Sequence, residues 1–310
     1  MWPYRDGEPE RFFYSRYDHP TGATAEAALG ELEGGRALLF SSGSAAVASV
    51  LLALLEPRRT VALAQGAYYG TGVLLRDLAR WGIRVAEFDQ TGPPPAADLV
   101  WLEAPSNPFL TMPDLDAAVR ARPGTLVVDS TAATPIHLRP LEHGADVVVH
   151  SATKYLGGHA DLLLGAAVTR SDDTWERLKS WRDRSGPVAS ADKAWLLLRS
   201  LETLELRVER QTETAQELVR RLREDARVEL VRYPGFGGLL SFDVRGDAGA
   251  VERAVRVIRN ETSLGGTRSA LESRRRWEGE RCPENLLRLS VGLEDADALW
   301  EDLEQALDAP

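Results

Sequence analysis

The stretch that decides the fold reads Asp146-Val-Val-Val-His-Ser-Ala-Thr-Lys-Tyr-Leu-Gly-Gly-His159. Its β-branched run is typical of a buried strand, and the small residues and glycines that follow indicate a loop. Ligands of open α/β sheets bind beyond such strand ends. Lys154 is one of only three lysines in the 310 residues, and the other two lie in polar, helix-like stretches. A lysine in this place, flanked by Ser151 and Thr153, suits a Schiff base beside a phosphate cradle.

Strands alternate with helices on both sides of this stretch. Short apolar runs predict strands over residues 37–40, 60–64, 84–88, 98–103, 125–129, 146–150 and 162–169. Helical patterns cover residues 25–35, 45–55 and 70–81. Because helices separate successive strands, the sequence predicts an α/β fold with a doubly wound, mostly parallel sheet.

The pattern changes in the second half of the chain. Residues 191–223 predict one long, charged helix. Beyond it, strands are expected at 239–244 and 287–291, and helices at 248–258 and 295–307. We therefore expect three parts: an extended N-terminal arm over 1–24, an α/β domain over 25–195 that contains the lysine stretch and would bind a cofactor there, and a smaller α+β domain over 196–310.

Composition restricts the classes of partner. The net charge of -10 argues against nucleic acid or an anionic membrane as the main partner. Cys282 is the only cysteine, which favours a reducing compartment, and we expect a cytoplasmic protein. The chain starts with polar residues, which predicts no signal peptide, and no apolar run is long enough to span a membrane.

Three further strand ends carry polar or aromatic residues. Ser42-Gly43-Ser44 opens an apolar helix, so it is either an ordinary N-cap or a site for an anion such as phosphate. Tyr69 begins the next helix and is either a half-buried aromatic or a ring that stacks on a cofactor. Asp129 ends a buried strand, where a pyridinium N–H would compensate its charge; a metal ligand or an N-cap are the other interpretations.

Two kinds of site are disfavoured. No second carboxylate or histidine stands near Asp129 at metal-ligand spacing, so we predict no metal site. A nicotinamide dehydrogenase would share the sheet architecture, but no Gly-x-Gly-x-x-Gly follows the first strand.

With these motifs in order, the chain resembles the cystathionine γ-synthase/γ-lyase family of cysteine and methionine metabolism, whose members use pyridoxal 5'-phosphate. In the first half the resemblance is carried by Tyr14-Ser-Arg-Tyr-Asp-His-Pro-Thr21, Leu32-Glu-Gly-Gly35, Ser41-Ser-Gly-Ser-Ala-Ala46, Tyr69-Gly-Thr71, Glu103-Ala-Pro-Ser-Asn-Pro108 and Asp129-Ser-Thr-Ala-Ala-Thr-Pro135. The lysine stretch follows, then Tyr233-Pro-Gly235, Ser263-Leu-Gly-Gly266 and Leu287-Arg-Leu-Ser-Val-Gly-Leu-Glu-Asp295. The resemblance covers nearly the whole chain and implies the fold-type I architecture of pyridoxal-phosphate-dependent transferases.

The resemblance also implies a role for each matching residue. Lys154 would hold the cofactor and move protons, Asp129 would pair with the pyridine nitrogen, and Tyr69 would stack on the ring. The phosphate would be bound by Gly43, Ser44, Ser151 and Thr153, and by Tyr14 and Arg16 from a neighbouring subunit of a homodimer or homotetramer. Asn107, Ser263 and Arg288 would lie on the substrate side, with Arg288 gripping the α-carboxylate.

The implied activity is cleavage or formation of a C–S bond at Cγ of an amino acid derived from homoserine, and we favour a cystathionine γ-lyase-like enzyme. Cystathionine γ-synthase, methionine γ-lyase and β-lyase activities are alternatives, as are an aminotransferase and a non-catalytic homologue. Several positions depart from the family pattern: the segment before Tyr14 is short, a loop after Gly235 is missing, and Arg268-Ser-Ala270 stands where Glu-Ser-Leu is usual. Thr262 also stands where members that handle cystathionine often have glutamate. These departures bear on the substrate and leave the cofactor residues intact.

Overall fold

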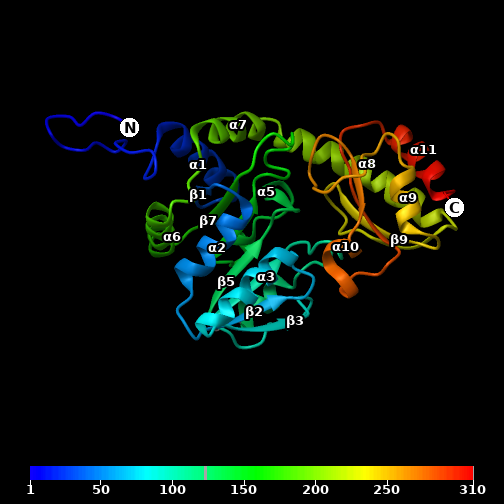
Figure 1. Cartoon of the computed structure of the whole chain (residues 1–310), viewed down its shortest axis with the longest axis horizontal. Coiled ribbons are helices and arrows are strands. Elements are labelled where there is room, and N and C mark those ends of the chain that lie inside the picture. The colour runs from blue at the N-terminus through cyan, green and yellow to red at the C-terminus, as the bar shows by residue number, and fades with distance from the viewer. Residues whose placement is uncertain (122–123, 310) are drawn as a thin grey trace.

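The chain folds into two lobes, each built around its own sheet, in a computed structural model that describes residues 1–121 and 124–309 (Figure 1). The helices are α1 (Pro20–Glu33), α2 (Gly43–Leu54), α3 (Tyr69–Leu78), α4 (Leu115–Ala121), α5 (Thr134–His137), α6 (Asp172–Ser185), α7 (Ala191–Leu201), α8 (Leu204–Glu224), α9 (Ala248–Ala254), α10 (Arg275–Glu278) and α11 (Ala296–Leu307). The strands are β1 (Arg36–Phe40), β2 (Thr60–Ala64), β3 (Arg84–Phe88), β4 (Leu99–Glu103), β5 (Thr125–Asp129), β6 (Val147–Ser151), β7 (Gly165–Thr169), β8 (Val228–Arg232), β9 (Leu239–Val244), β10 (Ala270–Ser273) and β11 (Leu286–Ser290). None of the described helices is long and apolar enough to cross a membrane.

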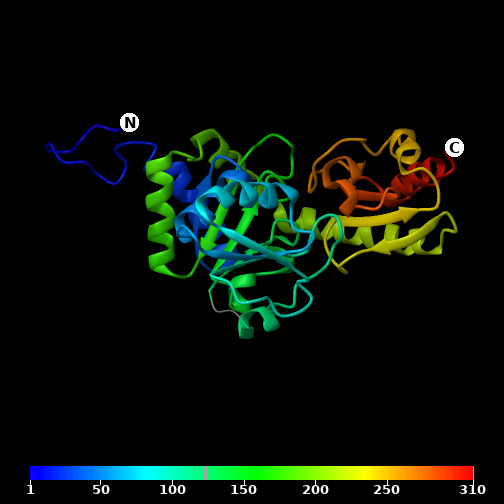
Figure 2. The ribbon, with the colours of Figure 1, turned by 60° about the horizontal axis from the view of Figure 1, so that its bottom comes forward.

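The first sheet has seven strands in the order β1-β7-β6-β5-β4-β2-β3. Strands β3, β2, β4, β5 and β6 run parallel, and β7 pairs antiparallel with both β6 and β1. Every residue of β4 and β7 is buried, as expected for strands whose two faces are both covered by helices. In Figures 1 and 2 the helices surround this sheet, and α2 packs against β6, β7 and α6. The predicted doubly wound, mostly parallel sheet is confirmed.

The second sheet has four antiparallel strands in the order β10-β11-β9-β8. Helix α8 packs on β8 and β9, α11 packs on α8 and α9, and α9 packs on β10. This is the smaller α+β lobe, and α8 leads into it from the first lobe (Figure 1). The exact domain limits, with a boundary near residue 195, stay a prediction.

Three predicted bounds are wrong. The arm does not extend to residue 24, because α1 already begins at Pro20, where the His19 ring accepts a hydrogen bond of 3.0 Å from the amide of Gly22. The helix over 191–223 is broken between α7 and α8. At that break the carbonyl of Ser200 accepts a hydrogen bond of 2.9 Å from the Nη2 of Arg207.

The third wrong bound is the helix expected to reach residue 258, which ends at Ala254. Beyond its end the amides of Arg256, Val257 and Ile258 donate to the carboxylate of Asp302, each at 2.8–2.9 Å, so they are not available for helical bonds. The sequence patterns also missed α4, α5, α6, α10, β8 and β10. Helix α6 is strongly charged, and only Leu178 among its apolar residues is fully buried, so it lacks a clear apolar stripe.

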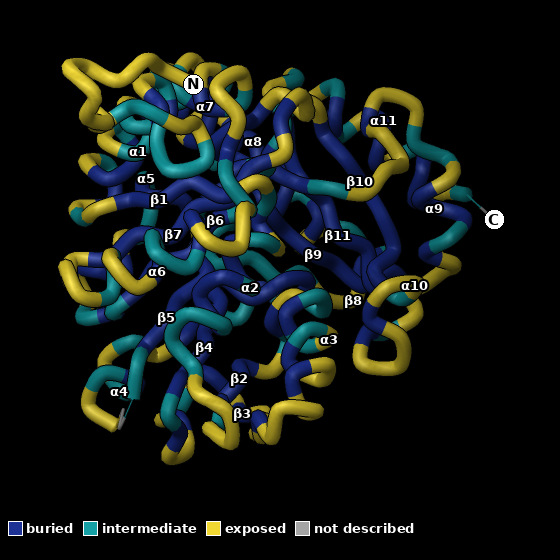
Figure 3. Tube along the Cα trace, turned by 60° about the vertical axis from the view of Figure 1, so that its left-hand side comes forward, coloured by how far each residue is buried: buried dark blue, intermediate teal, exposed yellow. Residues whose placement is uncertain are grey.

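Burial follows the two sheets. Figure 3 shows most strands of both lobes in the buried class, whereas the edge strands β3 and β8, the N-terminal arm and many loops are exposed or partly exposed. The carboxyl ends of β4, β5 and β6 lie at one edge of the first sheet and face the second lobe. That edge therefore brings the ends of three parallel strands together with residues more than 100 positions away in sequence.

Candidate active site

A cavity of about 340 Å³ lies between this sheet edge and the second lobe. The first lobe contributes residues from the strand ends and from the starts of α2 and α3, and the second lobe contributes a loop, β11 and the neighbourhood of α10. The lining side chains with polar or aromatic groups are Ser42, Ser44, Tyr68, Tyr69, Glu103, Asn107, Asp129, Thr131, Ser151, Thr153, Lys154, Thr262, Ser263, Arg274, Trp277 and Arg288. The sequence-predicted residues of the cofactor and substrate sites thus meet here, with the exception of Tyr14 and Arg16.

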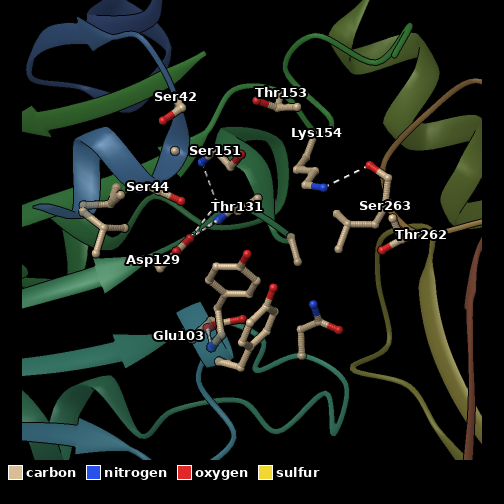
Figure 4. A pocket seen from close by; sticks show the side chains of 18 of the residues that line it. Ser42, Ser44, Glu103, Asp129, Thr131, Ser151, Thr153, Lys154, Thr262 and Ser263 are labelled. Atoms are coloured by element: carbon tan, nitrogen blue, oxygen red, sulfur yellow. Dashed lines mark hydrogen bonds between the residues drawn. The ribbon is translucent and has the colours of Figure 1, made fainter. Parts of the chain in front are cut away.

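One end of the cavity gathers hydroxyl groups at the start of α2 (Figure 4). Ser42 caps that helix, and its Oγ accepts from the amide of Ala45 at 3.0 Å. Gly43 lies so close to β6 that a Cβ there would be 2.7 Å from the Oγ of Ser151, so the close approach requires glycine. A helix N-terminus surrounded by serine hydroxyls is a favourable place for an anion such as phosphate.

The hydroxyl of Thr153 forms two hydrogen bonds within the loop after β6. It donates to the carbonyl of Leu164 at 3.1 Å and accepts from the amide of the same residue at 3.0 Å. The residue lines the cavity as expected, but these two bonds tie its hydroxyl to the chain.

Asp129 lies at the end of β5 and is only 8% exposed. Its Oδ1 accepts from both the amide and the hydroxyl of Thr131, at 3.0 and 2.5 Å. Burial raises the pKa of Asp129, while these two bonds and the nearby imidazole of His150 act in the opposite direction. The carboxylate is thus held in place, and a cationic N–H in the cavity would favour its ionised form.

Lys154 lies in the turn after β6 and reaches across to the second lobe. Its Nζ donates to the Oγ of Ser263 at 2.9 Å (Figure 4). Burial lowers the pKa of the Lys154 amine to about 8, and the positive charge of Arg288 acts in the same direction. Ser263 has φ 113°, a conformation that non-glycine residues rarely adopt, so the surrounding loop holds this hydroxyl in a strained place.

Arg288, in the middle of β11, is 3% exposed and lines the cavity wall. Its Nη1 donates to the side-chain oxygen of Asn107 at 3.2 Å, and its Nη2 donates to the carbonyl of Ser263 at 2.7 Å and to the carboxylate of Glu272. Burial lowers the pKa of Arg288 to about 10, so it is still a cation at neutral pH. The three predicted substrate-side residues therefore form one bonded cluster.

The aromatic wall comes from α3 and α10. The rings of Tyr68 and Tyr69 meet edge to face at 4.8 Å, and the ring of Trp277 lies nearly parallel to Tyr69 at 6.4 Å. Burial raises the pKa of Tyr68 to about 12, so its hydroxyl is protonated at neutral pH. Tyr69 is thus placed as expected, at the side of the cavity.

Several lining residues escaped the sequence reasoning. Glu103 stands in a motif that was recognised, but its role was not: its Oε2 accepts from the amide of Tyr68 at 2.5 Å, and burial raises its pKa well above its usual range. Arg274 and Trp277 were also missed as site residues, whereas Thr262 was noted as a departure from the family pattern but not placed in the site. The departure at Arg268-Ser-Ala270 is the signal that could have drawn attention to the residues that follow it.

Tyr14 and Arg16 lie outside this cavity. The Arg16 guanidinium stacks over the rings of Tyr14 and Tyr17, at 5.2 and 4.9 Å, and donates to the carbonyl of Asp183. The arm projects away from the first lobe in both Figure 1 and Figure 2. Within residues 1–121 and 124–309, no three His, Cys, Asp or Glu side chains are grouped so that they could hold a metal ion.

These residues fit pyridoxal phosphate. The hydroxyl cluster at α2 suits its phosphate, the buried carboxylate of Asp129 suits its pyridine N–H, and a lysine with a lowered pKa suits its aldehyde carbon. Residues 4–308 match the family described as Cys/Met metabolism PLP-dependent enzyme, and the chain belongs to this family.

Relatives of known name support the assignment. L-methionine γ-lyase of Pseudomonas putida is 36% identical, over 98% of this chain and 87% of the relative. Cystathionine γ-synthase of Mycobacterium tuberculosis is also 36% identical, over 96% of this chain and 86% of the relative. The crystal structure of cystathionine γ-synthase from Xanthomonas oryzae pv. oryzae in complex with cystathionine superposes with a TM-score of 0.94 at 32% identity, over 99% of this chain and 90% of that one. The predicted family, fold, cofactor and class of enzyme are confirmed.

Proposed function

We propose that this enzyme eliminates the γ-substituent of a sulfur amino acid or homoserine derivative, as a cystathionine γ-lyase-like enzyme. The observation that carries the proposal is that Lys154 and Arg288 both bind Ser263. Lys154 donates to its hydroxyl, and Arg288 donates to its backbone carbonyl. This arrangement places an amine that can accept a proton beside a guanidinium that can hold an α-carboxylate. The relatives named above for γ-elimination and γ-replacement support the same chemistry.

The cofactor residues have separate tasks. We propose that Gly43, Ser44, Ser151 and Thr153 hold the phosphate, with Thr153 contributing chiefly by fixing its loop through Leu164. Pyridoxal phosphate, when bound, withdraws electrons from Cα of the substrate, which makes the Cα and Cβ protons acidic and allows the γ-substituent to leave. Asp129 keeps the ring nitrogen protonated. Tyr69 packs against the ring face.

On the substrate side, Arg288 binds the α-carboxylate as a planar fork, oriented by Asn107. Lys154 removes the Cα proton and returns protons to the product, a task suited to an amine whose pKa is about 8. Ser263 accepts a hydrogen bond from Nζ and keeps the amine directed at the cavity between these transfers.

We further propose that Tyr14 and Arg16 complete the phosphate site of a second copy of this chain. The hydroxyl cluster at α2 contains no cationic side chain, although a phosphate is strongly anionic. Most of the arm is exposed and it projects from the first lobe (Figure 2), and neither Tyr14 nor Arg16 lines the cavity of its own chain. An arginine supplied by a partner in a two-fold dimer would balance the charge. Mixing inactive Arg16→Ala and Lys154→Ala chains should then restore part of the activity, whereas a fully active monomer in sedimentation contradicts the shared site.

A product assay tests the reaction. The enzyme loaded with cofactor is incubated with cystathionine, homocysteine or methionine, and 2-oxobutanoate and ammonia are measured. Pyruvate from cysteine or cystathionine would instead indicate β-elimination, and a thioether formed only with an added thiol would indicate γ-replacement. Lys154→Ala is the control, and it should abolish turnover while the melting temperature shows an intact fold. If Lys154→Ala retains most of the activity, the assigned role of the lysine is wrong.

A further inference from the structure

A second buried arginine shares the cavity wall with Arg288. Arg274 lies just before α10, is 4% exposed and lines the cavity. Its Nη1 donates to Glu272 at 3.0 Å and its Nη2 donates to Glu278 at 3.1 Å, while its Nε has no partner among the described residues. A guanidinium carries five N–H donors; the Nε of Arg274 is itself buried, so one N–H on each of Nη1 and Nη2 is left for a ligand.

The counterions of Arg274 do not face the substrate. Glu272 and Glu278 hold the guanidinium but are absent from the cavity lining, where the carboxyl groups are Glu103 and Asp129. Burial raises the pKa of Glu103 well above its usual range, which favours its neutral form, and Asp129 is assigned to the cofactor ring. A substrate in the cavity therefore meets two guanidinium groups, while the two glutamates that balance them lie outside the lining.

The two guanidinium groups are held side by side. The Oε1 atom of Glu272 accepts from both Arg274 and Arg288, and also from the hydroxyl of Thr262 at 3.1 Å. Its Oε2 accepts from the indole of Trp277 at 3.1 Å. The Glu272 carboxylate, which is not part of the cavity lining, fixes the positions of both guanidinium groups. Neither group therefore has to move when an anion binds in the cavity.

We propose that Arg274 determines substrate specificity by binding a second carboxylate at the far end of the substrate. Arg288 binds the α-carboxylate of the substrate. Arg274 binds a second carboxylate, which belongs to the γ-substituent that leaves. The inference deepens the proposed function, since it names the substrate class of the same site: amino acids with an acidic end to the γ-substituent rather than a neutral one. An uncharged end would cover the remaining Nη N–H donors of Arg274 without giving them a hydrogen-bond partner, which is costly.

A purely structural Arg274 is the competing interpretation. In that case it serves only to neutralise Glu272 and Glu278. Arg281 approaches Glu278 at 3.6 Å and Arg288 already bonds to Glu272, so both carboxylates have a second cation without Arg274. The positive charge of Arg274 is thus in excess of what the two glutamates need.

The test measures binding of two amino acids that differ only at the far end. L-Norleucine and L-2-aminoadipate have six carbons each and end in a methyl group and a carboxylate, respectively. Their dissociation constants for the cofactor-loaded enzyme are measured by titration calorimetry at pH 7. Neither has a γ-substituent that can leave, so the result does not depend on catalysis. The variants are Arg274→Ala and the charge-balanced pair Arg274→Gln with Glu278→Gln; Arg281→Ala is the control that removes a cation outside the cavity.

Wild type and Arg281→Ala should bind aminoadipate about tenfold to a hundredfold more tightly than norleucine, as expected for hydrogen bonds to a charged group. Both Arg274 variants should bring this ratio to within about threefold of unity while norleucine binding changes little. A wild-type enzyme that binds norleucine equally well, or does not bind aminoadipate, overturns the proposal. So does a ratio that survives in the Arg274 variants. If the ratio behaves as expected but cystathionine and homocysteine are not cleaved, the proposed reaction fails and the role of Arg274 stands.

Discussion

Attachment of the cofactor to Lys154 should follow the pH dependence of an amine whose pKa is about 8. Only the neutral amine reacts with an aldehyde. At pH 7 about one in ten such amines is neutral, against about one in 3,000 for a lysine of ordinary pKa. The structure therefore predicts a reactive fraction roughly 300-fold larger than that of an exposed lysine at the same pH.

The assay follows visible absorption after pyridoxal phosphate is mixed with cofactor-free enzyme at pH values from about 6 to about 10, a range that spans the shifted and the ordinary pKa. The same series with Nα-acetyl-lysine is the control, because dividing by it removes the ionisations of the cofactor itself. The ratio of the enzyme rate to the Nα-acetyl-lysine rate should fall steadily between pH 7 and pH 9. Over this range the neutral fraction of the exposed amine rises more steeply than that of the buried one. A constant ratio across the whole range would mean that burial does not lower the pKa of Lys154, and it would refute the reasoning.

Two substitutions should shift the pH dependence of cofactor attachment in opposite directions. Arg288 lowers the pKa of Lys154 by its positive charge, and Glu272 raises it. Arg288→Gln should therefore move the midpoint to higher pH, and Glu272→Gln should move it to lower pH. Shifts in the same direction for both variants would point to a change of structure rather than of local charge.

Three further outcomes are expected. Asp129→Asn should still bind cofactor but lose ~10²-fold or more in kcat, because a neutral amide does not keep the ring nitrogen protonated; steady-state turnover with bound cofactor measured by absorbance checks this. Arg288→Lys should raise KM for every amino acid substrate by ~10-fold or more, since a point charge cannot replace the planar fork; an unchanged KM would remove Arg288 from the site. Glu103→Gln should keep kcat at pH 7 within about threefold, because burial raises the pKa of the native group and so favours the neutral form that glutamine resembles. A carboxyl group whose folded-state pKa is raised stabilises the fold at low pH and loses that contribution as pH rises, so the melting temperature of Glu103→Gln should fall less than that of wild type in alkaline buffer.

The sequence by itself determined the architecture of the first lobe and predicted which residues would meet in one cavity. Strand, turn and helix signals are local, and the run ending at Lys154 contains its own strand and its own loop. The carboxyl ends of parallel strands meet at one sheet edge, so Ser44, Asp129 and Lys154 could be placed together from order alone. In the structure β5 and β6 pair in parallel, and Ser44, Asp129 and Lys154 line one cavity.

Only the tertiary structure decided the chemistry of the substrate wall. Three consecutive arginines, 274–276, look alike in the sequence, and only the fold shows that Arg274 faces the cavity while its neighbours do not. The same holds for Glu272, which accepts hydrogen bonds from two guanidinium groups, and for Glu103, whose pKa burial raises. Helix α9 likewise ends at Ala254, and the amides of Arg256 and Ile258 just beyond it donate to Asp302 on α11, which is far away in sequence. The reason is physical: the state of a charged group depends on its solvent exposure and on the charges within a few ångströms, and both are set by contacts between segments far apart in the chain.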